Sequence, residues 1–238
     1  MADKRLRAVV CDMDGVLVDT EHLWEEMWVR YCSSHGVTWT RQDTLSVQGM
    51  NLHEWSSYLS AKLGGELPAA AVAHGVVSGM HEALEDGRVE MLPGVRECLQ
   101  ELAERGVPLA VASSAPKALI QAILEHNGLA QCFRAVTSSE EVPRGKPWPD
   151  VYLEAAARLG VAPEECVAVE DSNNGIRAAA RAGLLVIALP NRKYPPDQAV
   201  LSLARYVADS FWQVKDLILQ LLCAAPGSPT FSNQGGQA

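Results

Sequence analysis

The stretch "RAVVCDMDGVLVDT", Arg7 to Thr20, joins a short apolar run to three aspartates. The run is typical of a strand that is buried on both faces, as in a parallel sheet between two layers of helices. Asp12 and Asp14 follow it two residues apart, so their side chains point the same way on an extended backbone. Buried carboxylates have to be paired, hydrated or bound to a cation. The stretch therefore predicts a strand that ends in an acidic site.

Strands and helices alternate along most of the chain. Four further apolar runs predict strands, namely "VPLAVASS", "FRAVTSS", "CVAVED" and "LLVIALP". Helical spacing of apolar residues occurs in "GVRECLQELAERG", "KALIQAILEHNG", "PDVYLEAAARLG" and "NNGIRAAARAG", and each of these ends in a glycine suited to a helix C-terminus. This alternation predicts an α/β fold with a Rossmann-like, doubly wound parallel sheet.

One interval, from Glu21 to about Gly87, contains no strand candidate. Its patterns "HLWEEMWVRYCSSHG", "LHEWSSYLSAKLGG" and "PAAAVAHGVVSGMHEAL" all favour helices. We expect an all-helical cap inserted after the first strand, at the strand ends where such sheets bind ligands. The expected division is a core domain of 1–20 and 88–224, a cap domain of 21–87, and a disordered tail at 225–238, which is small, polar and rich in proline and glycine.

Composition excludes several classes of function. A formal net charge of -9 argues against nucleic acid as a partner, because nucleic-acid phosphates require a basic face. The six cysteines show no CxxC pair or zinc-like spacing, which favours buried free thiols in a reducing compartment. No apolar run is long enough for a signal-peptide core or a membrane span. We expect a cytoplasmic, monomeric protein with no membrane partner.

Three more segments place polar groups after predicted strands. Ser113 and Ser114 can offer hydroxyl and N–H groups to a phosphate at a helix N-terminus, or can simply cap that helix. Lys146 lies on a proline-stiffened loop and can present its ammonium group to an anion, or can be an ordinary solvated lysine. Glu170 and Asp171 offer oxygen ligands of the kind that magnesium prefers, or act as caps.

Taken together and in this order, the four elements resemble the four motifs of the haloacid dehalogenase superfamily. The segments "DMDGVLVDTEHLW" and "GKPWPDVYLEAAARLGVAPEECVAVEDSNNGI" are especially similar to the branch that holds β-phosphoglucomutase and small sugar phosphatases. The resemblance covers about residues 5 to 190, including the helical cap.

The resemblance implies a role for each motif residue. Asp12 would be the nucleophile that forms an aspartyl-phosphate. Asp14 would protonate the leaving alcohol and then activate water. Ser113, helped by the backbone around Ser114, would hold the transferring phosphoryl group, and Lys146 would neutralise both the nucleophile and the phosphoryl oxygens.

Magnesium is the cofactor that the resemblance implies. Its expected ligands are Asp12, Asp14 through the backbone carbonyl, and Asp171, with Glu170 as a further ligand or as an outer partner. Dehalogenases of the superfamily lack the second aspartate of the first motif, so Asp14 favours phosphate esters as substrates. The expected function is hydrolysis of a small phosphorylated metabolite such as a sugar or polyol phosphate.

Two alternatives remain open: a β-phosphoglucomutase-type isomerase and a catalytically silent binding protein. The similar mutases carry a histidine at the position of Trp24 and an arginine at that of Leu52, and both are missing here. Phosphatase is therefore the better reading. Trp24 can stack on a sugar or fill the seam between cap and core. The segment Val47 to Asn51 is expected to reach the site, with Gly49 and Met50 reading the leaving group.

Overall fold

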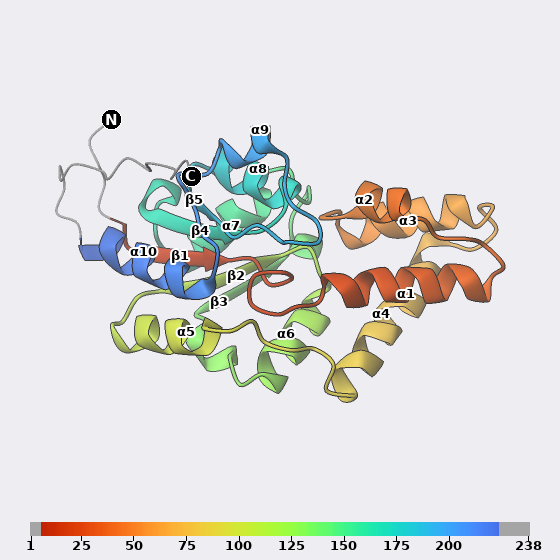
Figure 1. Ribbon diagram of the computed structural model, residues 1–238, viewed down its shortest axis with the longest axis horizontal. Coiled ribbons are helices and arrows are strands. Elements are labelled where there is room, and N and C mark those ends of the chain that lie inside the picture. The colour runs from red at the N-terminus through yellow and green to blue at the C-terminus, as the bar shows by residue number, and fades with distance from the viewer. Residues whose placement is uncertain (1–5, 224–238) are drawn as a thin grey trace, which may run out of the picture.

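The computed structural model describes residues 6–223 of the 238-residue chain, so the predicted tail at 225–238 lies outside the described residues. Its centre is a sheet of parallel strands in the order β3-β2-β1-β4-β5-β6 (Figure 1). The strands are β1 Ala8–Cys11, β2 Leu109–Ser113, β3 Ala135–Ser138, β4 Cys166–Glu170, β5 Leu185–Ala188 and β6 Tyr206–Val207. The predicted α/β fold with a doubly wound parallel sheet is confirmed.

Helices cover both faces of the sheet. They are α5 Val95–Glu104, α6 Lys117–His126, α7 Asp150–Leu159, α8 Asn173–Ala182, α9 Gln198–Leu201 and α10 Phe211–Cys223, with short 3-10 turns at Ala130–Cys132, Ser139–Glu141 and Pro163–Glu165. Alternate residues of β1 face opposite layers: Ala8 and Val10 pack in the cluster of α7 and α8, whereas Val9 and Cys11 pack with α5, α6 and α10. All four are buried, which explains why this strand has a continuous apolar sequence.

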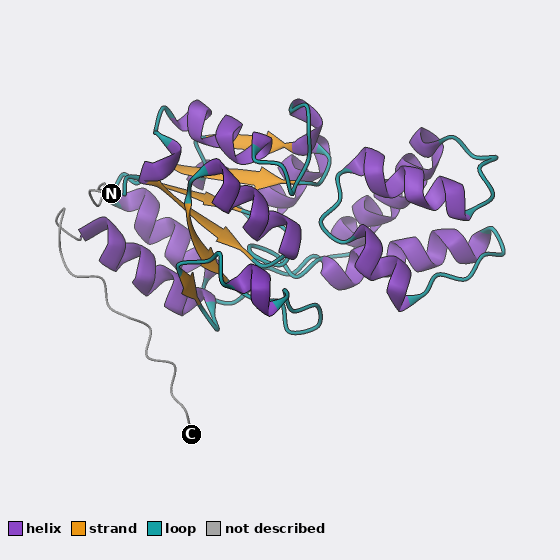
Figure 2. Cartoon of the chain, turned by 90° about the horizontal axis from the view of Figure 1, so that it is seen from above, coloured by secondary structure: helices purple, strands orange, loops and turns teal. Residues whose placement is uncertain are grey.

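Of the five helices between β1 and β2, the first four form a lobe beyond the carboxyl ends of the strands (Figures 1 and 2). They are α1 Glu21–Ser34, α2 Arg41–Val47, α3 Leu52–Lys62 and α4 Ala69–Glu85. We call this lobe the cap; the exact division of the chain into two domains stays a prediction. Helix α2 was not predicted. It has only seven residues and a mostly polar sequence, and its start is fixed by a reciprocal capping box between Thr40 and Asp43.

The centre of the cap is aromatic. Trp24, Trp28, Trp39 and Trp55 are all buried, and their neighbouring ring centroids lie 5.8–6.2 Å apart in tilted arrangements. Such contacts combine a large buried apolar area with favourable ring geometry. We call these four residues the tryptophan cluster.

The two connections between core and cap run side by side. The N–H of Asp19 donates to the carbonyl of Glu90 at 2.9 Å, and the N–H of Leu92 donates to the carbonyl of Leu17 at 3.0 Å. Between these bonds Val18 faces Met91 in an antiparallel bridge. The chain therefore enters and leaves the cap through one paired hinge.

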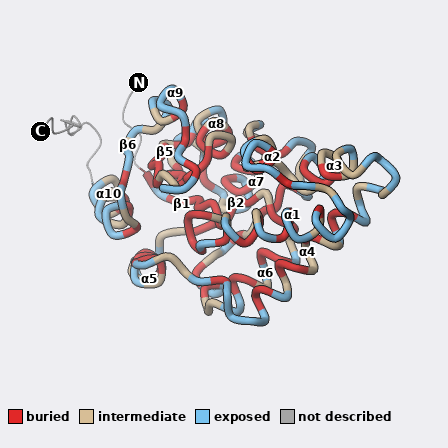
Figure 3. The backbone as a smooth tube through the Cα atoms, turned by 45° about the vertical axis from the view of Figure 1, so that its right-hand side comes forward, coloured by how far each residue is buried: buried red, intermediate tan, exposed pale blue. Residues whose placement is uncertain are grey.

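Burial follows this architecture: β1 and β2 are enclosed, while the outer faces of the helices are exposed (Figure 3). Within 6–223, no helix combines the length and the apolar character that a membrane crossing requires. All six cysteines lie in this part of the chain and are free thiols. Five are buried, as the sequence predicted, whereas Cys223 at the end of α10 is exposed.

Candidate active site

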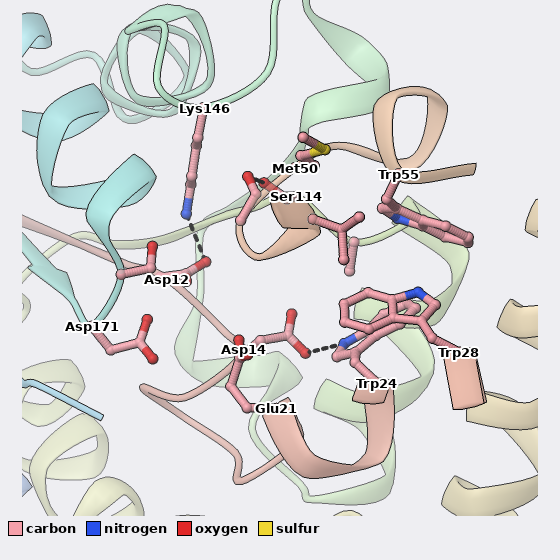
Figure 4. Close-up of a pocket in the computed structure, with 14 residues that line it drawn as sticks. Asp12, Asp14, Glu21, Trp24, Trp28, Met50, Trp55, Ser114, Lys146 and Asp171 are labelled. Atoms are coloured by element: carbon pink, nitrogen blue, oxygen red, sulfur yellow. Dashed lines mark hydrogen bonds and ion pairs between the residues drawn. The ribbon is translucent and has the colours of Figure 1, made fainter. Parts of the chain in front are cut away.

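A pocket opens at the carboxyl end of the sheet, between core and cap (Figure 4). Its lining residues are Asp12, Asp14, Glu21, Trp24, Trp28, Val47, Gly49, Met50, Trp55, Ser114, Ala115, Lys146, Asp171 and Ser172. Carboxylates and Lys146 occupy one side, and tryptophans with Met50 occupy the other (Figure 4). The pocket thus joins a charged floor to an apolar roof.

Lys146 lies between two carboxylates. Its Nζ is 2.8 Å from Oδ1 of Asp12 and 2.6 Å from Oε1 of Glu170, and its side chain is 2% exposed. Burial alone would lower the pKa of Lys146, but the charges of Asp12 and Glu170 raise it above its usual value. The ammonium group is therefore charged and fixed beside Asp12.

Glu170 is enclosed by donors. Its Oε1 accepts from Lys146 and from the Tyr152 hydroxyl, both at 2.6 Å. Its Oε2 accepts from the N–H groups of Asp171 and Ser172 at 3.1 and 3.3 Å and from the Ser172 hydroxyl at 3.2 Å. Both oxygens are thus committed to holding Lys146 and the turn after β4. Tyr152 was missed by the sequence reading, because its helical spacing looks like ordinary core packing.

The Asp171 carboxylate differs from that of Glu170 in its surroundings. Both of its carboxylate oxygens are buried, and neither has a hydrogen-bond partner within the described part of the chain. The carboxylate lies against Gly15, where an added Cβ would be 2.0 Å from Oδ2 and where φ is +75°. Burial, and next the charge of Glu21, raise the pKa of Asp171 well above its usual range. A buried carboxylate without a partner either takes up a proton or binds a cation.

A metal ion fits this arrangement. Asp12, Glu170 and Asp171 each place one carboxylate oxygen within 4.8 Å of the others. Burial likewise raises the pKa of Asp12, to about 7, against the lowering effect of Lys146. A divalent cation held by Asp12 and Asp171 would offset the cost of burying their charges, and an all-oxygen donor set suits a hard ion.

Asp14 is oriented by donors from two sides. Its Oδ1 accepts from the Thr20 hydroxyl at 2.6 Å. It also accepts from Nε1 of Trp24 at 2.8 Å (Figure 4). The hydroxyl of Ser113 lies 3.4 Å from Oδ2. The carboxylate is thus held in one orientation at the edge of the pocket. Thr20 was missed by the sequence reading, which placed no role on the linker after the first motif.

The two predicted serines differ in position. Ser113 is fully buried at the end of β2, where its hydroxyl also accepts from the N–H of Ala115 at 3.0 Å. Ser114 lines the pocket, and its hydroxyl donates to the carbonyl of Gly49 at 3.4 Å. Ser114 therefore faces the space available to a ligand, and Ser113 lies beneath it.

A family model described as haloacid dehalogenase-like hydrolase matches residues 6–183. The chain belongs to the haloacid dehalogenase-like hydrolases. This hydrolase is 34% identical over 197 residues to hexitol phosphatase B of Escherichia coli (strain K12), a match that covers 81% of the chain and 88% of the relative. The resemblance to this superfamily and its sugar-phosphatase branch is confirmed, and the chain is a phosphatase.

Two further comparisons place this hydrolase among its relatives. It is 32% identical over 184 residues to the bifunctional riboflavin kinase/FMN phosphatase of Arabidopsis thaliana, covering 77% of the chain and 48% of that protein, so it spans about half of that relative. The crystal structure of CbbY from Rhodobacter sphaeroides in complex with phosphate superposes with a TM-score of 0.77 at 26% identity, covering 90% and 96% of the two chains.

Glu21 adds an acidic group to the pocket of this hydrolase that the sequence reading missed. It is the first residue of α1, and Nε2 of Gln48 donates to its Oε2 at 3.4 Å. Burial, and next the charge of Asp14, raise the pKa of Glu21 to about 8. An acidic residue in a first helical turn is usually a helix-dipole partner, so sequence position alone does not single it out.

The loop between α2 and α3 reaches the core, as the sequence predicted for 47–51. Gly49 and Met50 line the pocket, and the side-chain amide of Asn174 donates to the carbonyl of Gln48 at 3.1 Å. Gly49 has φ +72°, and an added Cβ there would lie 3.1 Å from the Cβ of Asn174. The loop therefore follows the core surface closely. Whether Gly49 and Met50 select the leaving group stays a prediction.

A second contact ties cap to core, through Glu25 of α1. Lys193 Nζ lies 2.8 Å from its Oε2, and the Tyr194 hydroxyl donates to the same oxygen. The Thr44 hydroxyl of α2 donates to its Oε1 at 3.0 Å. Since Lys193 and Tyr194 belong to the core, their contacts with Glu25 exist only while the cap lies against the core, whereas the Thr44 bond lies within the cap.

Loss of this contact is expected to weaken substrate binding. The double variant Lys193→Ala/Tyr194→Phe removes two donors to Glu25, with a combined effect of about 1 kcal/mol on the docked cap. We expect KM to rise about 3- to 10-fold, with kcat changed less than twofold. Steady-state kinetics measure both, and Lys215→Ala, which breaks an ion pair with Glu101 inside the core, is the control. An unchanged KM in the double variant would show that the contact does not hold the cap.

Proposed function

We propose that the protein is a magnesium-dependent phosphatase that hydrolyses a sugar or polyol monophosphate through an aspartyl-phosphate. The observation that carries the proposal is the floor of the pocket. Asp12 lies beside the ammonium group of Lys146, Asp14 is fixed close by, and the oxygens of Asp171, which have no hydrogen-bond partner among residues 6–223, lie next to Asp12. A nucleophile, a cation, an acid and a metal-binding carboxylate are the parts that phosphoryl transfer to a carboxylate requires.

The first half of the proposed reaction transfers the phosphoryl group to the protein. A carboxylate oxygen of Asp12 attacks phosphorus, and the bond from phosphorus to the ester oxygen breaks. Asp14 gives its proton to that leaving oxygen, so an alcohol departs rather than an alkoxide. The charge of Lys146 offsets the negative charge shared by Asp12 and the phosphoryl oxygens.

The second half restores the enzyme. Asp14, now ionised, takes a proton from a water molecule as the water oxygen attacks phosphorus. The bond between phosphorus and Asp12 breaks, which releases inorganic phosphate and regenerates the Asp12 carboxylate. Asp14 thus returns to its protonated state, and the net reaction is hydrolysis of one ester bond.

Asp12, the carbonyl of Asp14 and Asp171 would hold the magnesium ion, with Glu170 fixing Lys146 from behind. The bound ion would supply positive charge against the phosphate dianion and the nearby carboxylates. Without it each pair of like charges about 4 Å apart costs about 4 kcal/mol at intermediate dielectric. Because of this repulsion we expect no activity without a divalent cation.

The roof of the pocket supports a sugar or polyol as the leaving group. Trp24, Trp28, Trp55, Val47 and Met50 present apolar surface opposite the charged floor. Aromatic faces suit the C–H surface of a carbohydrate chain, and a relative with 34% identity is a hexitol phosphatase.

The roof lacks what a mutase needs, namely cations that grip a second phosphate. Among the lining residues Lys146 is the one lysine or arginine. The three basic residues of 21–87 are engaged elsewhere, in the contacts Arg30–Glu82, Lys62–Asp43 and Arg41–Tyr194. These contacts favour the phosphatase over the β-phosphoglucomutase alternative, and the phosphatase relatives count against a silent binding protein.

The test is phosphate release from a panel of esters with Mg²⁺ and with EDTA. The panel contains hexitol and hexose phosphates, 2-phosphoglycolate, and FMN as a ribityl phosphate that carries an aromatic ring. We expect release from the sugar or polyol esters, loss of that release with EDTA, and its return with added Mg²⁺.

Two results would overturn the proposal. One is release that persists after the metal has been removed. The other is conversion of glucose 1-phosphate to glucose 6-phosphate with a bisphosphate primer and no release of phosphate, which would establish the mutase instead.

A further inference from the structure

Trp24 makes a polar contact that neither stacking on a sugar nor filling a seam explains. Its indole Nε1 donates to Oδ1 of Asp14 at 2.8 Å, across the boundary between cap and core (Figure 4). Trp24 is 7% exposed and Asp14 is half-buried, so the bond lies at the edge of the pocket. A donor at this distance fixes the carboxyl oxygen that it contacts.

Thr20 donates a second hydrogen bond to the same oxygen of Asp14. It is the N-cap residue of α1, a position where a threonine hydroxyl usually accepts from a backbone N–H of the first turn. Here the hydroxyl makes no such capping bond and donates instead to Oδ1 of Asp14 at 2.6 Å. The Thr20 hydroxyl therefore bonds to Asp14 and not to the N-terminus of α1.

The two donors are held rigidly. The N–H of Trp24 donates to the carbonyl of Thr20 at 3.0 Å, so both residues belong to the first turn of α1. The Trp24 ring lies 6.0 Å from the rings of Trp28 and Trp55 in the tryptophan cluster. Packing of the cap thus fixes the direction of the indole N–H.

Oδ1 of Asp14 consequently accepts two bonds, while Oδ2 has one long contact, 3.4 Å to the Ser113 hydroxyl. We propose that Trp24 and Thr20 are positioning residues: they hold Oδ1 so that Oδ2 carries the proton passed to the leaving oxygen. Asp14 is therefore fully oriented only while α1 is docked on the core. The inference rests on the proposed phosphatase function, because it assigns Asp14 the role of acid.

Leaving-group chemistry separates this role from a purely structural one. An alkyl phosphate needs its leaving oxygen protonated, whereas p-nitrophenyl phosphate releases a stable anion without an acid. The value of kcat/KM covers the steps up to release of the first product. Poor orientation of Asp14 should therefore lower kcat/KM for the alkyl ester and leave the aryl ester nearly unchanged.

The experiment compares Trp24→Phe, which removes the N–H and keeps an aromatic ring, with the wild type on both esters. We expect kcat/KM to fall about 10- to 100-fold on the best sugar or polyol phosphate and less than about threefold on p-nitrophenyl phosphate. Thr20→Val removes the second donor without loss of a capping bond and should show the same selectivity. Trp39→Phe is the control, because Trp39 belongs to the tryptophan cluster but donates to Thr44 and does not line the pocket.

An equal loss on both esters in Trp24→Phe, or no loss on either, would overturn the inference. If Trp24→Phe does not fold, as judged by thermal unfolding, Thr20→Val decides by the same criterion.

A readout independent of turnover comes from the indole N–H signals in a ¹⁵N-tryptophan NMR spectrum. The signal that disappears in Trp24→Phe should shift in Asp14→Asn. A wild type that releases no phosphate from any ester would refute the proposed function, whereas an indole signal unmoved by Asp14→Asn would refute the inference alone.

Discussion

Substitution of Asp12 by asparagine is expected to lower phosphate release by at least about 10⁴-fold. An amide oxygen is a poor nucleophile, so no covalent intermediate forms, and removal of a nucleophile typically costs this much or more. Phosphate release from the best substrate measures the effect. Acid quenching during turnover of a ³²P-labelled substrate should in addition trap labelled wild-type protein and leave the variant unlabelled.

Asp19→Asn is the matched control for this prediction. Asp19 follows the same motif, but its side chain is 57% exposed and pairs with His22 away from the pocket. We expect its activity to stay within about twofold of the wild type. Activity that persists in Asp12→Asn would mean that another group is the nucleophile, whereas equal losses in both variants would indicate damage to the segment as a whole.

The second large effect is expected for Lys146→Met, and it concerns both stability and activity. The change keeps an unbranched side chain, one atom shorter, but leaves the buried carboxylates of Asp12 and Glu170 without their cation. Removing one partner of a buried ion pair costs about 3–5 kcal/mol of unfolding free energy. Loss of one charge-stabilising group at the reacting centre lowers kcat about 10²- to 10³-fold. Urea unfolding and steady-state kinetics measure the two effects.

Two further variants separate these effects. Lys117→Met makes the same change at a side chain that is 39% exposed and pairs with Glu141 at the surface, so we expect less than about 1 kcal/mol and unchanged kinetics. Adding Glu170→Gln to Lys146→Met removes one unpaired buried charge and should restore part of the lost stability without restoring activity. Recovery of activity in the double variant would contradict the assigned role of Lys146.

The five principal strands could be predicted from the sequence because a parallel strand buried on both faces is a continuous apolar run. Strand β6 could not, since Tyr206–Val207 is only two residues at the sheet edge. Helix α2 was missed for a similar reason: it is short and mostly polar, although the spacing of Thr40 and Asp43 is a capping signal that could have revealed it.

The site also contains residues that could be predicted from the sequence and residues that could not. Asp12, Asp14, Lys146 and Asp171 follow strand ends, and parallel strands bring their carboxyl ends to one edge of the sheet, so their meeting was predictable. Sequence could not predict the roles of three further residues, Thr20, Glu21 and Tyr152. They reach the site through the docking of helices, which residue spacing does not specify. The monomeric state and the cytoplasmic location remain predictions.

The paired hinge has a consequence for how such an enzyme can diversify. Residues 17–19 and 90–92 are hydrogen-bonded to each other, so the two ends of the inserted segment are already joined where they meet the core. The entropy of closing a loop depends only weakly on its length, about 0.6 kcal/mol for each doubling. A longer, shorter or unrelated insert would therefore place little strain on the sheet and its four strand-end residues. The roof over the substrate can be exchanged as a module while the chemistry beneath it is inherited unchanged.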